Sequence, residues 1–155
     1  MGERWPGNRI GIDWGKVRIG VAASNRGTTF AYPVTTVAAG PQALDQLAAV
    51  IAEHGPEVVY LGLPLNLKGQ HGPAAEHVLS HVPGLAKRAG DIPIRLVDER
   101  LSTAQASREL GRAGRAAKRQ RTIIDQAAAV EILQRALDQE SRTGRPVGQL
   151  WKGDE

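Results

Sequence analysis

Two runs typical of buried strands, of which the first is continuously apolar, constrain the fold of this chain more than any other feature of its sequence. They read EVVYLGLP at 57–64 and IPIRLVDE at 92–99. A strand with one solvated face alternates apolar and polar residues, whereas an unbroken run is typical of a strand that is covered on both faces. A helix is predicted between the runs, at about 74–89, where Pro83 should kink or break it. This order predicts parallel strands between helices.

Before the first run, the sequence predicts an antiparallel meander. Residues 9–13 and 17–23 form two short apolar strands, and Gly15 lies in the turn between them. A third β-rich run, TTFAYPVTTV at 28–37, contains Pro33. Proline cannot donate a hydrogen bond to a neighbouring strand, so we expect this run at an edge of the sheet or at a bulge.

Helical signals fill the rest of the chain. A helix is expected to open at Pro41 and to close at Gly55, because apolar residues between them recur at helical spacing. Two more are expected near the C-terminus, at about 102–111 and 123–137, the first with a capping box formed by Ser102 and Gln105. The predicted fold class is therefore α/β, with a mixed five-stranded sheet flanked by helices.

Length and composition favour a single domain. The chain has 155 residues, of which 41% are hydrophobic, and we expect one domain over 1–155 with its core at about 9–137 and a frayed tail at 138–155. It contains no cysteine, which excludes disulfides, thiolate zinc sites and cysteine nucleophiles. Because no apolar run reaches 18 residues and no signal-peptide core is present, the expected location is the cytoplasm, away from membranes.

The positive charge of the chain is concentrated in one segment. The formal net charge is +4, yet residues 100–121 alone carry +6. The basic residues of this segment are Arg100, Arg108, Arg112, Arg115, Lys118, Arg119 and Arg121. We interpret 111–121 as a mobile basic loop that binds the phosphates of a nucleic acid; the alternative is a solvated loop without a partner.

Several acids lie where apolar residues would be expected. Asp13 is on the first apolar strand, Asp98 and Glu99 end a buried strand, and Asp125 shares a helical stripe with Ala129. Acids from these three elements, two strands and a helix packed on their sheet, would repel one another unless a cation separated them. Mg²⁺ or Mn²⁺ prefers such oxygen ligands, and ions of this kind support phosphodiester cleavage.

Each acid also has a structural explanation. Asp13 could accept backbone hydrogen bonds from the turn at Gly15. Asp98 and Glu99 could form surface ion pairs with neighbouring arginines. Asp125 could belong to a capping box with Thr122. Individually, these acids are weak indications of a site.

Four motifs together resemble one family. They are GIDWGKVRIGVA, LGLPLNLKGQHG, VDERLSTAQA and IDQAAAVEIL, and their order and spacing are those of the YqgF family, also called RuvX, a Holliday-junction-resolvase-like family. The resemblance extends from about Arg9 to Leu137. It implies a ribonuclease-H-like fold, a cytoplasmic location and a nuclease that processes the 5′ end of pre-16S ribosomal RNA in ribosome biogenesis. The alternatives are a resolvase of branched DNA in recombination and repair, and a non-catalytic nucleic-acid-binding module.

The resemblance also implies roles for individual residues. The acidic site of the family falls on Asp13, Glu99 and Asp125, which would be both catalytic and metal-binding. The expected nucleic-acid-binding residues are Lys16, Arg18, Asn66, Arg100, Arg112, Arg115, Lys118, Arg119 and Arg121. An RNA-processing enzyme could act as a monomer, whereas a junction resolvase needs two active sites and hence a homodimer. Here Asn25 stands where the family often has an acid, which rules out an acidic role at that position.

Other functions fit the sequence less well. GIDWGK also resembles the phosphate-binding turn of the sugar-kinase and actin ATPases, but those proteins use two duplicated domains. His77 and His81, at helical spacing, could hold zinc, although a solvated helix face is the simpler interpretation. Trp14 could stack on a base, and we favour packing against the sheet.

Overall fold

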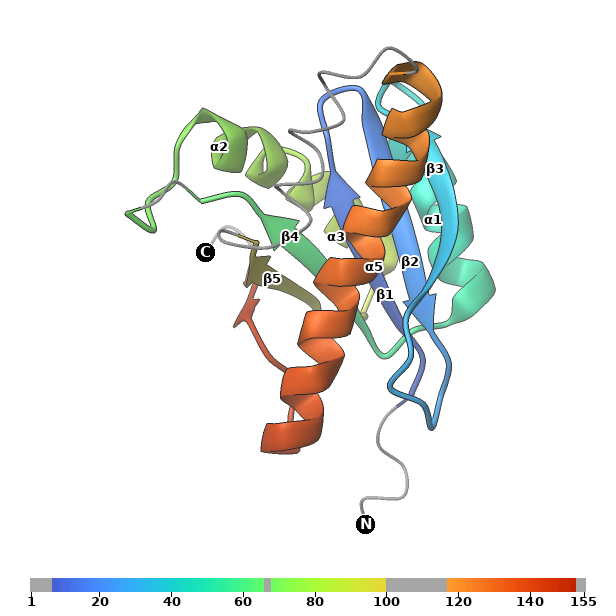
Figure 1. Ribbon diagram of the computed structural model, residues 1–155. Helices are drawn as coiled ribbons and strands as arrows, with labels where there is room; N and C mark the ends of the chain where they lie inside the picture. Colours follow the sequence, from blue (N-terminus) through green and yellow to red (C-terminus); the bar gives the residue numbers. More distant parts are fainter. Residues whose placement is uncertain (1–6, 66–67, 100–116, 153–155) are drawn as a thin grey trace.

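The computed structural model describes residues 7–65, 68–99 and 117–152, without the side chains of 117–125. A six-stranded mixed sheet forms its centre, in the order β3-β2-β1-β4-β5-β6 (Figure 1). The strands are β1 (Arg9–Trp14), β2 (Arg18–Ser24), β3 (Tyr32–Ala38), β4 (Val58–Leu63), β5 (Ile94–Asp98) and β6 (Gln149–Leu150). The helices are α1 (Ala43–His54), α2 (Pro73–Leu79), α3 (Val82–Ala89) and α5 (Ala117–Thr143). The predicted mixed α/β fold is confirmed, but the sheet has six strands rather than the five expected, because the C-terminal residues add β6.

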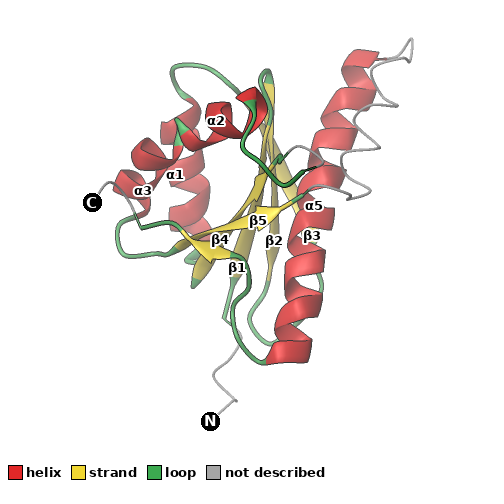
Figure 2. Cartoon of the chain, turned by 90° about the vertical axis from the view of Figure 1, so that its left-hand side faces the viewer, coloured by secondary structure: helices red, strands yellow, loops and turns green. Residues whose placement is uncertain are grey.

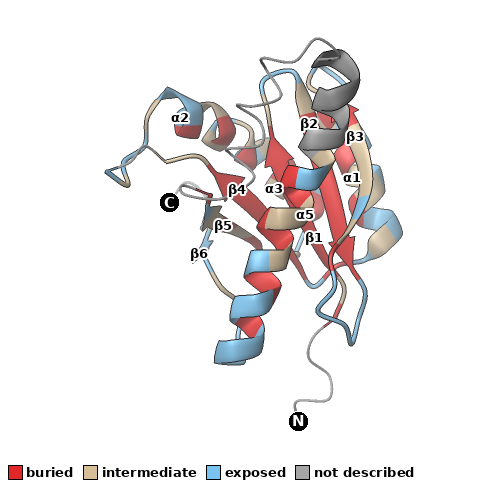
Figure 3. Ribbon diagram, in the orientation of Figure 1, coloured by how far each residue is buried: buried red, intermediate tan, exposed pale blue. Residues whose placement is uncertain are grey.

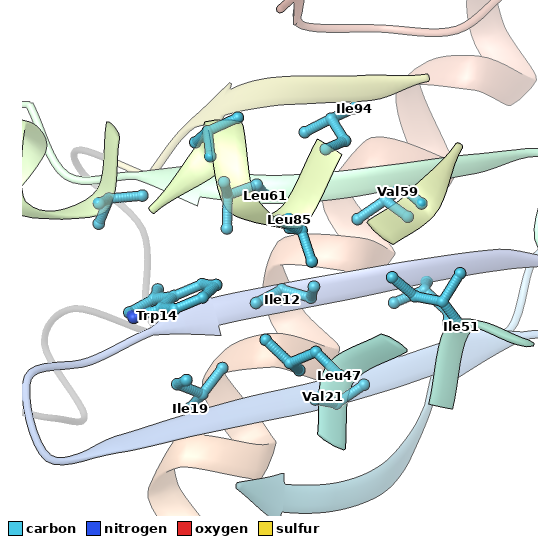
Figure 4. Close-up of a cluster of buried hydrophobic side chains, with 14 of the residues drawn as sticks. Ile12, Trp14, Ile19, Val21, Leu47, Ile51, Val59, Leu61, Leu85 and Ile94 are labelled. Carbon is cyan, nitrogen blue, oxygen red and sulfur yellow. The ribbon is translucent and has the colours of Figure 1, made fainter. Parts of the chain in front are cut away.

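Helices cover both faces of the sheet. Figure 2 shows α1, α2 and α3 on one side and α5 alone on the other. On the first side, alternate residues of the strands, among them Ile12, Val21 and Leu61, pack against Leu47 of α1 and Leu85 of α3 (Figure 4). This double cover explains why the central strands are buried along their whole length (Figure 3).

The central strands pair as the sequence predicts: first an antiparallel hairpin, then parallel strands joined by crossovers. β1 and β2 are antiparallel, and the amide of Gly15 donates to the carbonyl of Arg18 in the turn at 2.9 Å. β4 pairs with β1 and β5 pairs with β4, both in parallel. Parallel neighbours need a crossover, and α1 and then α2–α3 supply the two crossovers on the same side.

Both predictions made from internal prolines are confirmed. β3 is an edge strand, and its pairing with β2 shifts register between Val21 and Ala22, where Ala22 faces Pro33. The helix expected at 74–89 is broken into α2 and α3, and Pro83 lies in the first turn of α3. A proline is tolerated there because the first amides of a helix have no partner within it.

The C-terminal part differs from the expectation of a frayed tail from 138 onward. Helix α5 continues to Thr143, and the short strand β6 then pairs antiparallel with β5. Within this part, Glu140 is buried against Arg9 and Tyr60. The sequence does not reveal this burial, because Glu140 is polar and its partner Arg9 is 131 residues away in the chain.

The basic segment is described only in part. Residues 117–121, expected to belong to a mobile loop, form the first turns of α5. The helix expected at 102–111 and the loop residues 111–116 lie outside the described residues. No helix among the described parts of the chain is long and apolar enough to span a membrane.

Candidate active site

Asp13 is buried on the face of the sheet that α5 covers. Ile10, Ile12 and Trp14 pack on the opposite side with α1 and α3, so strand alternation turns Asp13 toward α5. Its side chain is only 1% exposed. Removing a carboxylate from water is costly, and such a group persists in a protein when its surroundings compensate for the lost hydration.

Glu99 lies on the same face, directly after β5. Its amide donates to the carbonyl of Leu63 at 3.2 Å, which extends the pairing of β5 with β4 by one residue. Its carboxyl group lies over Gly62, because a Cβ built on that glycine would be 3.5 Å from the Glu99 Cδ and Oε1 atoms. Glu99 is 3% exposed, whereas the side chain of Asp98 is exposed.

Asp13 and Glu99 come from nearby positions of the sheet. Ile12 pairs with Leu61, so Asp13 is level with Gly62, the residue beneath the Glu99 carboxyl group. Neighbouring strands are about 4.8 Å apart. The two carboxylates therefore occupy one region of the face that α5 covers.

Helix α5 brings the backbone of residue 125 to the part of the sheet where Asp13 lies. The Gln126 side-chain amide donates to the Thr36 hydroxyl at 2.9 Å, and the register runs from Thr36 to Gly20 on β2 and from Gly20 to Asp13 on β1. Ala129, one turn further along α5, lies over Gly11. The backbone at 125 thus lies near Asp13, on the stripe of α5 that faces the sheet. The side chain of Asp125 lies outside what the structure describes.

The described donors suit a hard divalent cation. Carboxylate oxygens are the ligands that Mg²⁺ and Mn²⁺ prefer, and Mg²⁺ keeps several waters when protein ligands are few. Within the described residues, no group of three His, Cys, Asp or Glu side chains could hold a metal ion. Asp13 and Glu99 would be two ligands, and Asp125 would complete the set.

Two of the predicted nucleic-acid-binding residues lie at this end of the sheet. Lys16 is exposed in the turn between β1 and β2, and Arg18 is half-buried at the start of β2. Arg18 lies on the same face as Asp13, because it is two residues from Gly20, which pairs with Asp13. The other expected positions, Asn66, Arg100, Arg112, Arg115, Lys118, Arg119 and Arg121, lie outside the described residues or have undescribed side chains.

Trp14 packs in the core, as favoured from the sequence. It is buried, and its ring stacks on that of His81 with centroids 4.7 Å apart. The ring of His77 meets that of His81 edge-on at 4.9 Å. The premise that both histidines share one helix face is wrong, because α2 ends at Leu79 and His81 precedes α3. Burial and, to a lesser extent, the charge of His77 lower the pKa of His81.

A buried polar network beneath α5 was missed at the sequence level. The Arg9 guanidinium donates to Glu140 through Nε at 3.0 Å, and the Tyr60 hydroxyl also donates to Glu140. The three side chains are at most 1% exposed. Burial and the Glu140 carboxylate raise the pKa of Tyr60 far above its ordinary value. The signal in the sequence was Arg9 at the start of a mainly apolar strand.

Comparisons with known proteins find a matching family and similar proteins. Residues 7–139 match the RuvX family, described as Holliday junction resolvase. A Cutibacterium acnes protein named "Putative pre-16S rRNA nuclease" is 47% identical over 133 residues, which are 86% of this chain and 83% of that protein. A Streptomyces coelicolor protein of the same name is 46% identical over 145 residues, or 92% and 87% of the two chains.

A solved structure shows the same fold. The RuvC of T. thermophilus, in complex with a Holliday junction substrate, is similar with a TM-score of 0.53 over 92% of this chain and 100% of that one. The two sequences are 19% identical, so the likeness concerns the fold alone. It confirms the predicted ribonuclease-H-like architecture.

Proposed function

From the premise that this chain belongs to the RuvX family, we propose that it is a divalent-metal-dependent nuclease that processes the 5′ end of pre-16S ribosomal RNA. The observation that carries the chemistry is the pair of buried carboxylates, Asp13 and Glu99, on the sheet face beneath α5. A module that only bound nucleic acid would have no need to bury two acids on one face of its sheet, because both acids repel phosphate. The name that both relatives carry supports the RNA substrate.

Asp13, Glu99 and Asp125 would hold one or two ions of Mg²⁺ or Mn²⁺. The metal, when bound, would activate water and neutralise charge on the scissile phosphate and on the leaving oxygen. The role of the chain is to keep the oxygen ligands in place: β1 holds Asp13 rigidly, and the amide of Glu99 continues the sheet pairing. Burial of both acids beneath α5 lowers the local dielectric, which strengthens their attraction for a cation.

The basic residues would hold the nucleic acid on either side of the site. Lys16 is exposed in the turn that follows Asp13, and the segment before α5 contributes further positive charge in the sequence. These side chains would bind phosphates regardless of base sequence and so position the backbone over the acids. A ribosomal RNA precursor is met in the cytoplasm, where we expect the protein to act.

A second candidate function is resolution of four-way DNA junctions. It is favoured by the description of the family and by the fold shared with a RuvC bound to such a junction. Paired symmetric cuts need two active sites, so this function predicts a homodimer on the junction, whereas trimming of RNA can proceed with a monomer.

The experiment compares matched RNA precursors and four-way junctions as substrates, with Mg²⁺ or Mn²⁺ varied. We expect Asp13→Asn and Glu99→Gln to lower the cleavage rate by orders of magnitude while substrate binding persists. Asp98→Asn is the matched control, because it removes an exposed acid next to Glu99 and should cleave like the wild type. Unchanged cleavage by Asp13→Asn would overturn the proposed metal site, absence of cleavage by the wild type would favour the binding module, and cleavage restricted to junctions would favour the second function.

A further inference from the structure

Helix α5 rests directly on the backbone of β1 at Gly11. A Cβ built on Gly11 would lie 2.7 Å from the Cβ of Leu133 and 3.3 Å from the carbonyl oxygen of Ala129. Real Cβ atoms essentially never approach another heavy atom more closely than 3.0 Å. Only glycine therefore allows the helix to approach the strand this closely.

The obstruction at Gly11 differs from that at Gly62, on the same face of β4. At Gly62 the nearest atom is Cδ1 of Ile132, the end of a side chain that can rotate away. At Gly11 the obstructing atoms belong to the helix itself or are attached directly to its backbone. A side chain at position 11 would consequently displace α5 as a body.

The C-terminal end of α5 is held in place by a buried network. Glu140 is bonded to Arg9 and Tyr60, all three being buried. With α5 anchored there, pressure at Leu133 would tilt the helix. Seven residues separate Leu133 from the anchor and fifteen separate position 125 from it, so at about 1.5 Å per residue the displacement at 125 would be about twice that at Leu133.

We propose that Gly11 is a positioning residue for the acidic site, because it sets the height of α5 above β1 and thereby the separation of position 125 from Asp13 and Glu99. The inference rests on the proposed function, which assigns those three acids to metal. Metal ligands tolerate errors of only about 0.2 Å in their distances. A small tilt of α5 would therefore weaken the metal site while the sheet stays intact.

The test uses Gly11→Ala and two readouts, of which neither is cleavage. Mn²⁺ binding to the purified protein is measured by calorimetry, and we expect the dissociation constant to rise by about tenfold or more, as for supporting residues of other metal sites. The position of α5 is measured as the distance between two spin labels by double electron–electron resonance. The labels are attached to cysteines introduced at two exposed positions, Ala49→Cys on α1 and Ala127→Cys on α5. The chain has no natural cysteine, so only these two sites are labelled. The distance should lengthen in Gly11→Ala.

The matched control is Gly84→Ala, on the other side of the sheet. There a new Cβ would lie 2.7 Å from Cδ1 of Leu44, a contact of comparable closeness that does not involve α5. We expect this variant to keep both the wild-type distance and the wild-type Mn²⁺ affinity. If Gly11→Ala does not fold, Ala129→Val adds volume to the same interface from the helix side and is judged by the same readouts.

The inference requires that Gly11→Ala lengthen the distance between the spin labels and also weaken Mn²⁺ binding. It is overturned if Gly11→Ala keeps the wild-type distance, if the distance lengthens without loss of Mn²⁺ affinity, or if Gly84→Ala weakens Mn²⁺ binding equally. The variant Asp13→Asn distinguishes a failure of the proposed function from a failure of the inference about Gly11. If Asp13→Asn still binds Mn²⁺ and cleaves like the wild type, the proposed function fails; if it loses both while Gly11→Ala behaves like the wild type, only the role of Gly11 fails.

Discussion

At the scale of single residues, alternation along β5 gives the adjacent acids Asp98 and Glu99 different environments. Glu99 is buried on the face that α5 covers, and Asp98 is exposed. Both residues are carboxylates at the end of a buried strand, and in the sequence only the resemblance to the family singles out Glu99. The site we propose uses the acid on the covered face, which makes the other an internal control.

His81 should make stability depend on pH. Burial and the charge of His77 lower its pKa in the folded protein, so the unfolded chain binds more protons as the pH falls through about 6.5. Stability is therefore expected to be complete above that pH and to decline below it. Melting temperatures at pH 7.5 and 5.5 should differ less in His81→Asn than in the wild type, and an equal difference would contradict the prediction.

At the scale of elements, the end of α5 is held by the network of Arg9, Glu140 and Tyr60. Glu140→Gln removes the acid of a buried ion pair with Arg9, and loss of one member of such a pair costs about 3–5 kcal/mol in comparable cases. Tyr60→Phe removes one hydrogen bond to a charged group, at a cost of about 1.5–3 kcal/mol.

Urea unfolding measures both changes in the free energy of unfolding. We expect Glu140→Gln to destabilise the protein more than Tyr60→Phe does. The exposed acid Asp138, two residues earlier on α5, provides the control, since Asp138→Asn should cost little. A cost for Tyr60→Phe that exceeded that of Glu140→Gln would show that the ion pair does not dominate the network.

At the scale of the whole molecule, the excess positive charge lies in one segment of the sequence, at 100–121. We expect replacement of Arg115, Lys118 and Arg119 by alanine to weaken binding to all RNA sequences alike. The slope of log affinity against log salt should flatten by about 0.7 to 0.9 for each phosphate that the variant no longer binds. Asp13→Asn, in contrast, should leave that slope unchanged and abolish cleavage.

Filter binding or anisotropy over a range of salt concentrations separates these effects. As a control of equal charge change, Lys87, Arg88 and Arg142 are exposed on α3 and on the last turn of α5, away from Asp13. Their replacement by alanine should change the slope less. If both triple variants flatten the slope equally, binding is spread over the whole surface and the segment has no special role.

Local patterns were enough to predict most of the elements. Continuous apolar runs specify strands that are covered on both faces, and the prolines at 33 and 83 mark an edge strand and a helix break, because proline lacks the amide that these structures need. The four motifs identified the family, and with it the fold, from residues alone. These features depend on neighbours in the chain, and so the sequence by itself determines them.

Long-range packing decided the rest. Glu140 is polar and lies in a polar stretch, and only its contact with Arg9, 131 residues away in sequence, makes it a core residue. The strand β6 exists because β5 offers an unpaired edge, and Glu99 rather than Asp98 is covered because α5 lies on that side of the sheet. The assignment of Asp125 to the site stays a prediction, supported by the level of its backbone. The burial of Glu140 and Glu99 depends on α5 lying against this face of the sheet, where Gly11 and Gly62 leave room for it. Such close packing involves surfaces that meet only after folding, and so no local sequence pattern reveals it.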